Sequence, residues 1–222
     1  MINTHINNDQ IRDSKIEFIY GYDALCGWCY GFCDELDKVY AALSTKVNFT
    51  LVNGGLFARD GQLKMTDMKD HIKRNMGYVS QKTGRAFGES FISGVLEESE
   101  YLYDSKTSAI AIAVIKDMLP AKTFEFSANI QKAFFYQGKD IQSDEFYLAL
   151  ISEYSIVKED FLYKLHSRQF AQYAEAEFKQ AADYGFTSFP SCLLIKGNQR
   201  FFLSHDYSAI SIIENIKDII QR

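Results

Sequence analysis

The order of apolar and polar positions near the start of the chain predicts a strand, a helix and a second strand. The apolar run at residues 16–22 is typical of a buried strand, and residues 27–43 place their apolar positions at helical spacing. Residues 47–52 alternate as a second strand, which Gly54 and Gly55 end. A strand, a helix and a strand in this order predict a parallel βαβ unit.

From about residue 62 the pattern changes to a long succession of helices. Ser143 is predicted to cap one of them, because Asp144 and Glu145 follow it at the positive end of the helix dipole. Gly185 is predicted to end the last one. Apolar positions at helical spacing predict helices at residues 66–82, 84–98, 105–118, 122–136, 143–152, 158–165 and 168–184.

An antiparallel hairpin and a final helix complete the predicted elements. The apolar stretches at residues 188–195 and 201–203 flank Gly197 and Asn198, which are typical of a tight turn between two strands. Residues 208–220 then follow a helical pattern. The chain therefore closes with a ββα unit.

The βαβ and ββα units together form what we call the sheet unit, and the helical stretch separates its two halves. We expect a discontinuous domain of residues 1–60 and 170–222 that contains the sheet unit, with a helical insertion domain of residues 61–169. No repeat, low-complexity tract or linker sequence stands between them, so we expect the insertion to pack on the sheet unit.

Composition and charge narrow the class of protein. The 222 residues are 47% hydrophobic and 15% aromatic, which is enough for a buried core. The formal net charge of −5 and the lack of a basic cluster argue against nucleic acid as a partner. No apolar run approaches the roughly 20 residues that span a bilayer, so we expect no membrane partner. Residues 1–15 lack the apolar core of a secretory signal, and we expect a loose tail and a cytoplasmic location.

Two cysteines at the predicted start of the first helix carry the candidate chemistry. Cys26 and Cys29 are separated only by Gly27 and Trp28. The unpaired N–H groups and the positive dipole end of a helix favour a thiolate at Cys26. Cys29 lies one turn further, where it can attack a mixed disulfide formed on Cys26. In a reducing cytosol such a pair is more often catalytic or metal-binding than a structural disulfide, and we expect dithiol–disulfide exchange.

The other two cysteines have more than one interpretation. Cys33 falls on the same helical face as Cys26 and Cys29, so it is a third redox thiol, a metal ligand with them, or a small core residue. Three interpretations are open for Cys192: it completes a four-cysteine zinc site, it lies close to the redox pair, or it is a core residue. Core positions are favoured for both, since buried cysteine is common. We expect no metal site from the histidines, which lack ligand spacing: His5, His71, His166 and His205.

The predicted elements and the cysteine pair together resemble the thioredoxin fold, and the helical insertion resembles its DsbA branch. Within that branch the chain is similar to the cytosolic FrnE-like group, also described as predicted protein-disulfide isomerases. The resemblance implies an α/β fold in which a βαβ and a ββα unit surround a central mixed sheet, with a large all-helical insertion. The segments that carry it are residues 23–32, 54–56, 104–105, 131–140 and 185–190.

The resemblance also implies roles for individual residues. Cys26 is the attacking thiol and Cys29 the resolving one. Pro190 alone is either a turn proline at a strand start or a cis-proline, and the resemblance implies the cis-proline that shapes the substrate site. Phe189 would then pair with an extended substrate backbone, and Trp28 would line the groove that receives it.

A buried acid beneath such a helix often assists proton transfer from the resolving thiol. Asp23, Glu35 and Asp37 are all near the cysteine pair in the sequence. The sequence does not choose among these three carboxyl groups.

The function implied is a thiol-disulfide oxidoreductase or protein-disulfide isomerase acting on protein or peptide thiols and disulfides. No bound cofactor is expected, and electrons pass to or from glutathione or a dithiol partner. One alternative is a glutathione-dependent isomerase or transferase of the same fold, whose relatives tend to replace the first cysteine by serine. The other is a non-enzymatic metal-binding or holdase module that uses Cys26, Cys29 and Cys33 as ligands.

Overall fold

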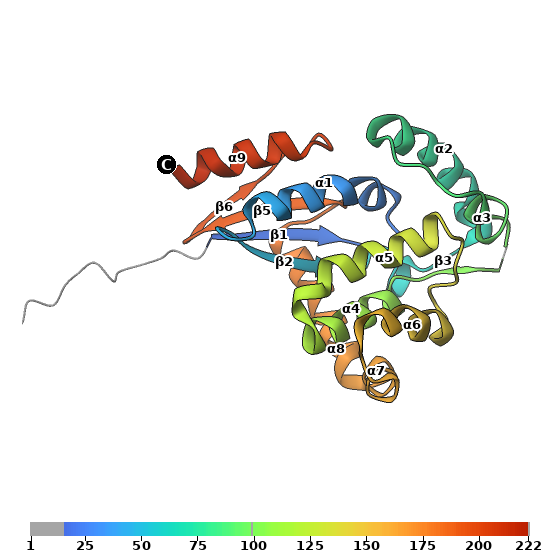
Figure 1. Ribbon diagram of the computed structural model, residues 1–222. Helices are drawn as coiled ribbons and strands as arrows, with labels where there is room; N and C mark the ends of the chain where they lie inside the picture. Colours follow the sequence, from blue (N-terminus) through green and yellow to red (C-terminus); the bar gives the residue numbers. More distant parts are fainter. Residues whose placement is uncertain (1–15, 99, 222) are drawn as a thin grey trace, which may run out of the picture.

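The computed structural model describes residues 16–98 and 100–221, and a four-stranded mixed sheet lies at its centre (Figure 1). The tail expected at residues 1–15 lies outside the described residues. Helix α1 (Gly27–Leu43) connects the two parallel strands, β1 and β2, and β1 is antiparallel to β5, as β5 is to β6. In spatial order the strands are β2 (Asn48–Asn53), β1 (Ile16–Tyr22), β5 (Ser191–Lys196) and β6 (Gln199–Phe202).

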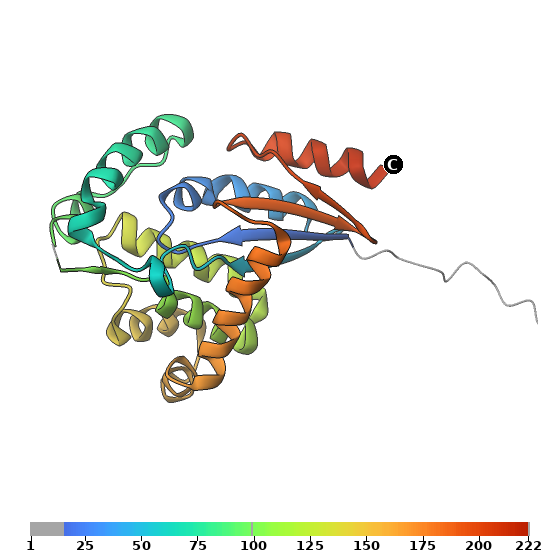
Figure 2. The same ribbon diagram turned by 180° about the vertical axis from the view of Figure 1, so that it is seen from behind.

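The two faces of this sheet are covered by different helices (Figures 1 and 2). Helices α1 and α9 (Ala209–Gln221) lie on one face, and α8 (Arg168–Tyr184) crosses the other. Successive strand residues point to opposite faces, so Tyr20 joins the main core while Ile19 packs with Ala181 of α8. Both faces are therefore buried, which explains why β1 is apolar along nearly its whole length.

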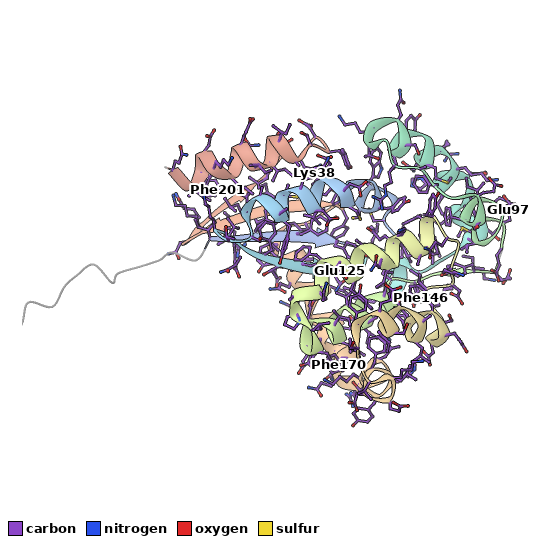
Figure 3. All side chains as sticks on the ribbon, viewed as in Figure 1. Lys38, Glu97, Glu125, Phe146, Phe170 and Phe201 are labelled. Atoms are coloured by element: carbon purple, nitrogen blue, oxygen red, sulfur yellow. The ribbon has the colours of Figure 1, made fainter. Side chains whose placement is uncertain are left out.

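The insertion contributes a group of helices below the sheet and an arm beside the start of α1 (Figure 1). Figure 3 shows the side chains of Phe146 and Phe170 among the lower helices, where Phe170 is buried. We call residues 65–97 the α2 arm, since α2 (Met65–Thr83) is its main element. The other helices of the insertion are α3 (Glu89–Ile92), α4 (Lys106–Met118), α5 (Thr123–Phe135), α6 (Asp144–Ile151) and α7 (Lys158–Leu165).

Most predicted helices are confirmed to within one residue at either end. The Ser143 hydroxyl accepts a hydrogen bond from the Phe146 N–H at 3.3 Å, which confirms the predicted cap. Gly185 ends α8 with a φ of 86°, as its position predicts. Local sequence signals were sufficient for these boundaries.

The helix predicted at residues 84–98 is wrong. Gly84 ends α2 with a φ of 74°, and only α3 and a 3₁₀ turn at Val95–Glu97 follow. A Cβ at Gly88 would lie 1.7 Å from the carbonyl oxygen of Tyr136, so the backbone there passes against α5 instead of coiling. The sequence also missed a two-stranded sheet of β3 (Leu63–Lys64) and β4 (Leu102–Tyr103).

Candidate active site

The turn that joins β1 to α1 carries both cysteines of the pair, and we call residues 23–29 the redox turn. It lies at the end of the sheet that faces α2 (Figure 1). Cys26 is the N-cap of α1, and its Sγ accepts a hydrogen bond from the Cys29 N–H at 3.3 Å. That N–H has no partner inside the helix, so it is placed to stabilise a thiolate on Cys26.

The segment before β5 lies directly against Cys26. The Cys26 thiol donates a hydrogen bond to the Phe189 carbonyl oxygen at 3.3 Å, and the Phe189–Pro190 peptide bond is cis. A Cβ at Gly54 would lie 2.0 Å from Cζ of the Phe189 ring, so the ring rests on a position that only glycine fits. The structure thus brings Cys26, Phe189 and Pro190 together from distant parts of the chain.

The two thiols of the pair differ in their surroundings. Cys29 is fully buried, and burial together with the neighbouring Cys26 raises its pKa well above the ordinary value for a thiol. Cys26 lines a groove that opens beside it, and its sulfur accepts a hydrogen bond from the Cys29 N–H. Only Cys26 is therefore placed to meet a disulfide that enters from outside.

A groove of about 260 Å³ opens beside Cys26, between the redox turn and the α2 arm. Trp28 and Phe189 also line it, which brings two more of the predicted site residues to the same place. Trp28 is half-buried, with its ring centroid 5.1 Å from that of Tyr207. The other groove walls are mainly apolar, and include Leu56, Phe57, Met68, Ile72, Met76 and Phe87. Methionine side chains adapt to varied apolar partners.

Of the three acids near the pair, Asp23 is the buried one. Asp23 is only 2% exposed. Its Oδ1 accepts hydrogen bonds from the Leu25 N–H at 3.0 Å and the Ser105 hydroxyl at 2.9 Å. Oδ2 accepts from the Leu56 N–H at 2.7 Å. Burial raises the pKa of Asp23 to about 6, even though these donors favour the carboxylate.

The other two acids lie elsewhere. Glu35 accepts a hydrogen bond from the Ala209 N–H at 2.7 Å at the start of α9, and Asp37 is exposed. Asp23 is thus the carboxyl group built into the redox turn.

Cys33 and Cys192 are buried, as the core interpretation predicts. The Cys33 thiol donates to Oε1 of Gln131 at 3.0 Å, and burial raises its pKa to about 12. Cys192 stands opposite Tyr20 in the sheet, and burial raises its pKa as well. Among residues 16–98 and 100–221, no three histidine, cysteine or acidic side chains gather closely enough to hold a metal ion.

Sequence reasoning gave no site role to the residues of the insertion that contact the redox turn. Tyr103, Ser105 and Gln131 all place side-chain hydrogen bonds there. Ser105 and Gln131 lie in segments that carry the resemblance, and Gln131 is also a polar residue at an otherwise apolar helical position. Within the described part of the chain, no helix combines the length and the apolar character needed to cross a membrane.

The structure is similar to solved structures of disulfide-exchanging proteins. A "putative protein disulfide isomerase" from Nitrosomonas europaea has a TM-score of 0.82 and 22% identity over 93% of this chain and 98% of its own. The cytosolic disulfide reductase DsbM from Pseudomonas aeruginosa has a TM-score of 0.76 and 22% identity, covering 92% and 97%. DsbM with GSH has a TM-score of 0.77 and 22% identity, covering 93% and 100%.

At the level of sequence, no protein-family model and no curated protein matches the chain. The structural similarities show its fold, which is the thioredoxin fold with a DsbA-like helical insertion. The predicted fold class is confirmed.

Proposed function

We propose that this protein is a thiol-disulfide oxidoreductase that acts on protein or peptide substrates through Cys26 and Cys29. The observation that carries the proposal is the Cys26 sulfur at the helix N-cap, held by the Cys29 N–H at 3.3 Å beside the cis Phe189–Pro190 bond. The names of the similar structures, a disulfide isomerase and a disulfide reductase, support the same class of reaction.

The exchange proceeds in two steps. The Cys26 thiolate attacks one sulfur of the substrate disulfide, the substrate S–S bond breaks, and a mixed disulfide forms as one substrate thiolate leaves. Cys29 then loses its proton and attacks the Cys26 sulfur, which closes the Cys26–Cys29 disulfide and releases the second substrate thiolate. Two electrons pass to the substrate, and the two thiolates that leave take up protons.

The surroundings of Cys26 support an extended peptide as the substrate. We propose that its backbone pairs with Phe189, next to Pro190, in the manner of an added strand. Its side chains then enter the groove that Trp28 lines. In this proposal the apolar walls, not specific polar contacts, provide most of the affinity.

The oxidised pair must be reduced again before another cycle. We propose that glutathione or a dithiol partner supplies these electrons, without a bound cofactor, and that the protein works in the cytoplasm. The similar protein DsbM supports this proposal, because it is named a cytosolic disulfide reductase and one of its structures contains GSH.

Substitution of each cysteine tests the proposal. We expect Cys26→Ser to abolish disulfide reduction, and Cys29→Ser to accumulate a mixed disulfide that mass spectrometry detects on Cys26. Cys192→Ser is the control, because this buried thiol does not line the groove beside Cys26. Full activity in the Cys26→Ser protein would contradict the proposal.

The reduction potential is the companion measurement. Trp28 is the only tryptophan and lies between the two thiols, so its fluorescence should follow the redox state in glutathione buffers. A potential near −270 mV would indicate a reductase, and one near about −120 mV an oxidant. Absence of a reversible transition would contradict the proposal.

A further inference from the structure

Gln131 of α5 is completely buried, and its amide group bonds to two backbone carbonyl groups of the redox turn. Its Nε2 donates to the carbonyl oxygen of Asp23 at 3.0 Å and to that of Cys26 at 3.3 Å. Its Oε1 accepts from the Cys33 thiol at 3.0 Å and lies nearer to that thiol than the other acceptor, the Cys29 carbonyl oxygen at 3.5 Å. A carbonyl oxygen can only accept, so these partners determine which way the amide points.

The two carbonyl groups that Gln131 holds are those that form the turn and begin the helix. The Asp23 carbonyl also accepts from the Cys26 N–H at 3.2 Å, and the Cys26 carbonyl accepts from the Tyr30 N–H at 3.0 Å. A rotation of the Cys26–Gly27 peptide group would break both bonds to the Cys26 carbonyl. A shift of residues 23–26 away from α5 would move the Cys26 sulfur relative to the Cys29 N–H.

Two further side chains of the insertion contact the same segment. The Tyr103 hydroxyl donates to the Leu25 carbonyl at 3.3 Å, and the Ser105 hydroxyl donates to the Asp23 carboxylate at 2.9 Å. Neither bonds to a carbonyl group of either cysteine. Gln131 is the contact from the insertion that reaches the backbone of Cys26 itself.

We propose that Gln131 is a positioning residue for the thiol exchange, and that Cys33 serves as the hydrogen-bond donor that orients it. By holding the Asp23 and Cys26 carbonyls, Gln131 keeps the Cys26 sulfur against the Cys29 N–H and so stabilises the thiolate. The role of Cys33 is then neither redox nor metal-binding. The inference rests on the proposed function, and it assigns control of the redox pair to a helix outside the sheet unit.

The test compares Gln131→Met with the parent protein. Methionine has a similar length but offers no amide, so the turn loses its support without a large cavity. We expect a less stable thiolate and thus a less stable reduced form. The equilibrium constant with glutathione should shift about tenfold toward the disulfide, which is about 30 mV more negative for a two-electron couple. The pH midpoint for alkylation of Cys26 should rise.

Ser127→Ala is the matched control in the same helix. Ser127 is buried in α5 one turn before Gln131, and its hydroxyl donates to the Phe124 carbonyl at 2.8 Å without touching the redox turn. We expect this variant to lose stability but to keep the potential within twofold in the equilibrium constant. A general loosening of α5 would shift both variants, whereas a positioning role shifts only Gln131→Met.

Two Cys33 variants separate the donor from the thiol. Cys33→Ser keeps a donor for Gln131 and should keep the parent potential and alkylation profile. Cys33→Ala removes the donor and should shift both in the direction of Gln131→Met, by about threefold in the equilibrium constant. Equal reduction potentials for Cys33→Ser and Cys33→Ala would contradict the assigned role of Cys33. This comparison can be made even if Gln131→Met does not fold.

The outcomes also separate this inference from the proposed function. A folded Gln131→Met protein with the parent potential and the parent Cys26 alkylation profile would overturn the inference alone. A parent protein without a reversible dithiol–disulfide transition would overturn the proposed function. The alkylation profile would still show whether Gln131 positions the Cys26 thiol.

Discussion

The helical insertion approaches the redox turn from two sides that differ in chemistry. Hydrogen bonds that are buried or partly buried join α4 and α8 to β2 and α5 to the redox turn, and a partly buried ion pair links α4 to α8. The α2 arm instead faces the turn across an apolar groove. Its ion pairs of Glu97, labelled in Figure 3, with Lys69 and Lys73 lie within the arm. The ion pair of Arg85 with Asp34 joins the arm to α1. The first side determines geometry, because directional bonds fix positions. The second leaves room for a ligand, because apolar contacts tolerate many shapes.

The partly buried ion pair of Lys116 and Glu177 shows how the first side is attached. Nζ of Lys116 in α4 lies 2.6 Å from Oε1 of Glu177 in α8 and donates to the Leu51 carbonyl at 2.7 Å. Oε2 of Glu177 accepts from the backbone N–H of Asn53 at 3.0 Å and from its side-chain amide at 2.7 Å. Helix α4 of the insertion, α8 and the end of β2 therefore share one polar cluster.

Breaking this cluster should have the largest effect on stability. Lys116→Met leaves the half-buried Glu177 carboxylate without its cation, which costs about 3 kcal/mol in the free energy of unfolding, the lower end for buried pairs because both side chains are partly exposed. Lys122→Met is the control, because its ion pair with Glu125 is exposed on both sides and should change stability by less than about 0.5 kcal/mol. Urea unfolding of both variants measures the difference. Equal losses would contradict the role given to the Lys116–Glu177 pair in attaching α4 and α8.

The buried side should also respond to pH, through Asp23. Its pKa is about 6 in the folded protein and ~3.9 in an unfolded chain, so the folded state holds the proton more tightly. The unfolded state then binds fewer protons between these values, and the free energy of unfolding falls as pH rises from about 4 to about 6. Two pKa units correspond to about 3 kcal/mol, and Asp23 adds no further change above pH 7.

Comparison with Asp23→Asn isolates this contribution. Other carboxyl groups titrate in the same range, and the pKa of Glu35 is lowered by its bond to Lys38, which gives the opposite slope. We therefore expect the fall in unfolding free energy between pH 4.5 and pH 7 to be smaller in Asp23→Asn than in the parent. Parallel pH curves for the two proteins would contradict the assignment.

The same contrast explains what could be predicted from the sequence. The helix and strand positions follow from apolar periodicity, which is a local signal. The Cys26–Cys29 pair is also local, because its motif spans only four consecutive residues. The choice of Asp23 over Glu35 and Asp37 was not local. It depends on the Leu56 N–H and the Ser105 hydroxyl, which the fold brings to the carboxylate.

The failures at residues 84–98 and at Gln131 have the same origin. The backbone at Gly88 takes its path because Tyr136 of a distant segment lies against it. Gln131 is separated from Cys26 by 105 residues, so no spacing in the sequence relates them. A glutamine on an apolar helix face indicates a buried partner, but only the fold identifies it.

A substitution in the groove wall should have the smallest effect, and it should change substrate binding and not stability. Met76 of α2 is half-buried in the groove wall, and Met76→Gln keeps its length and helix propensity while making it polar. We expect about tenfold weaker half-saturation by an apolar cysteine-containing disulfide peptide, or about 1.4 kcal/mol, with an unchanged maximal rate. Reduction by glutathione, which has no apolar side chain, should not change. Met118→Gln, half-buried outside the groove, is the control, and an equal effect there would exclude the groove as the peptide site.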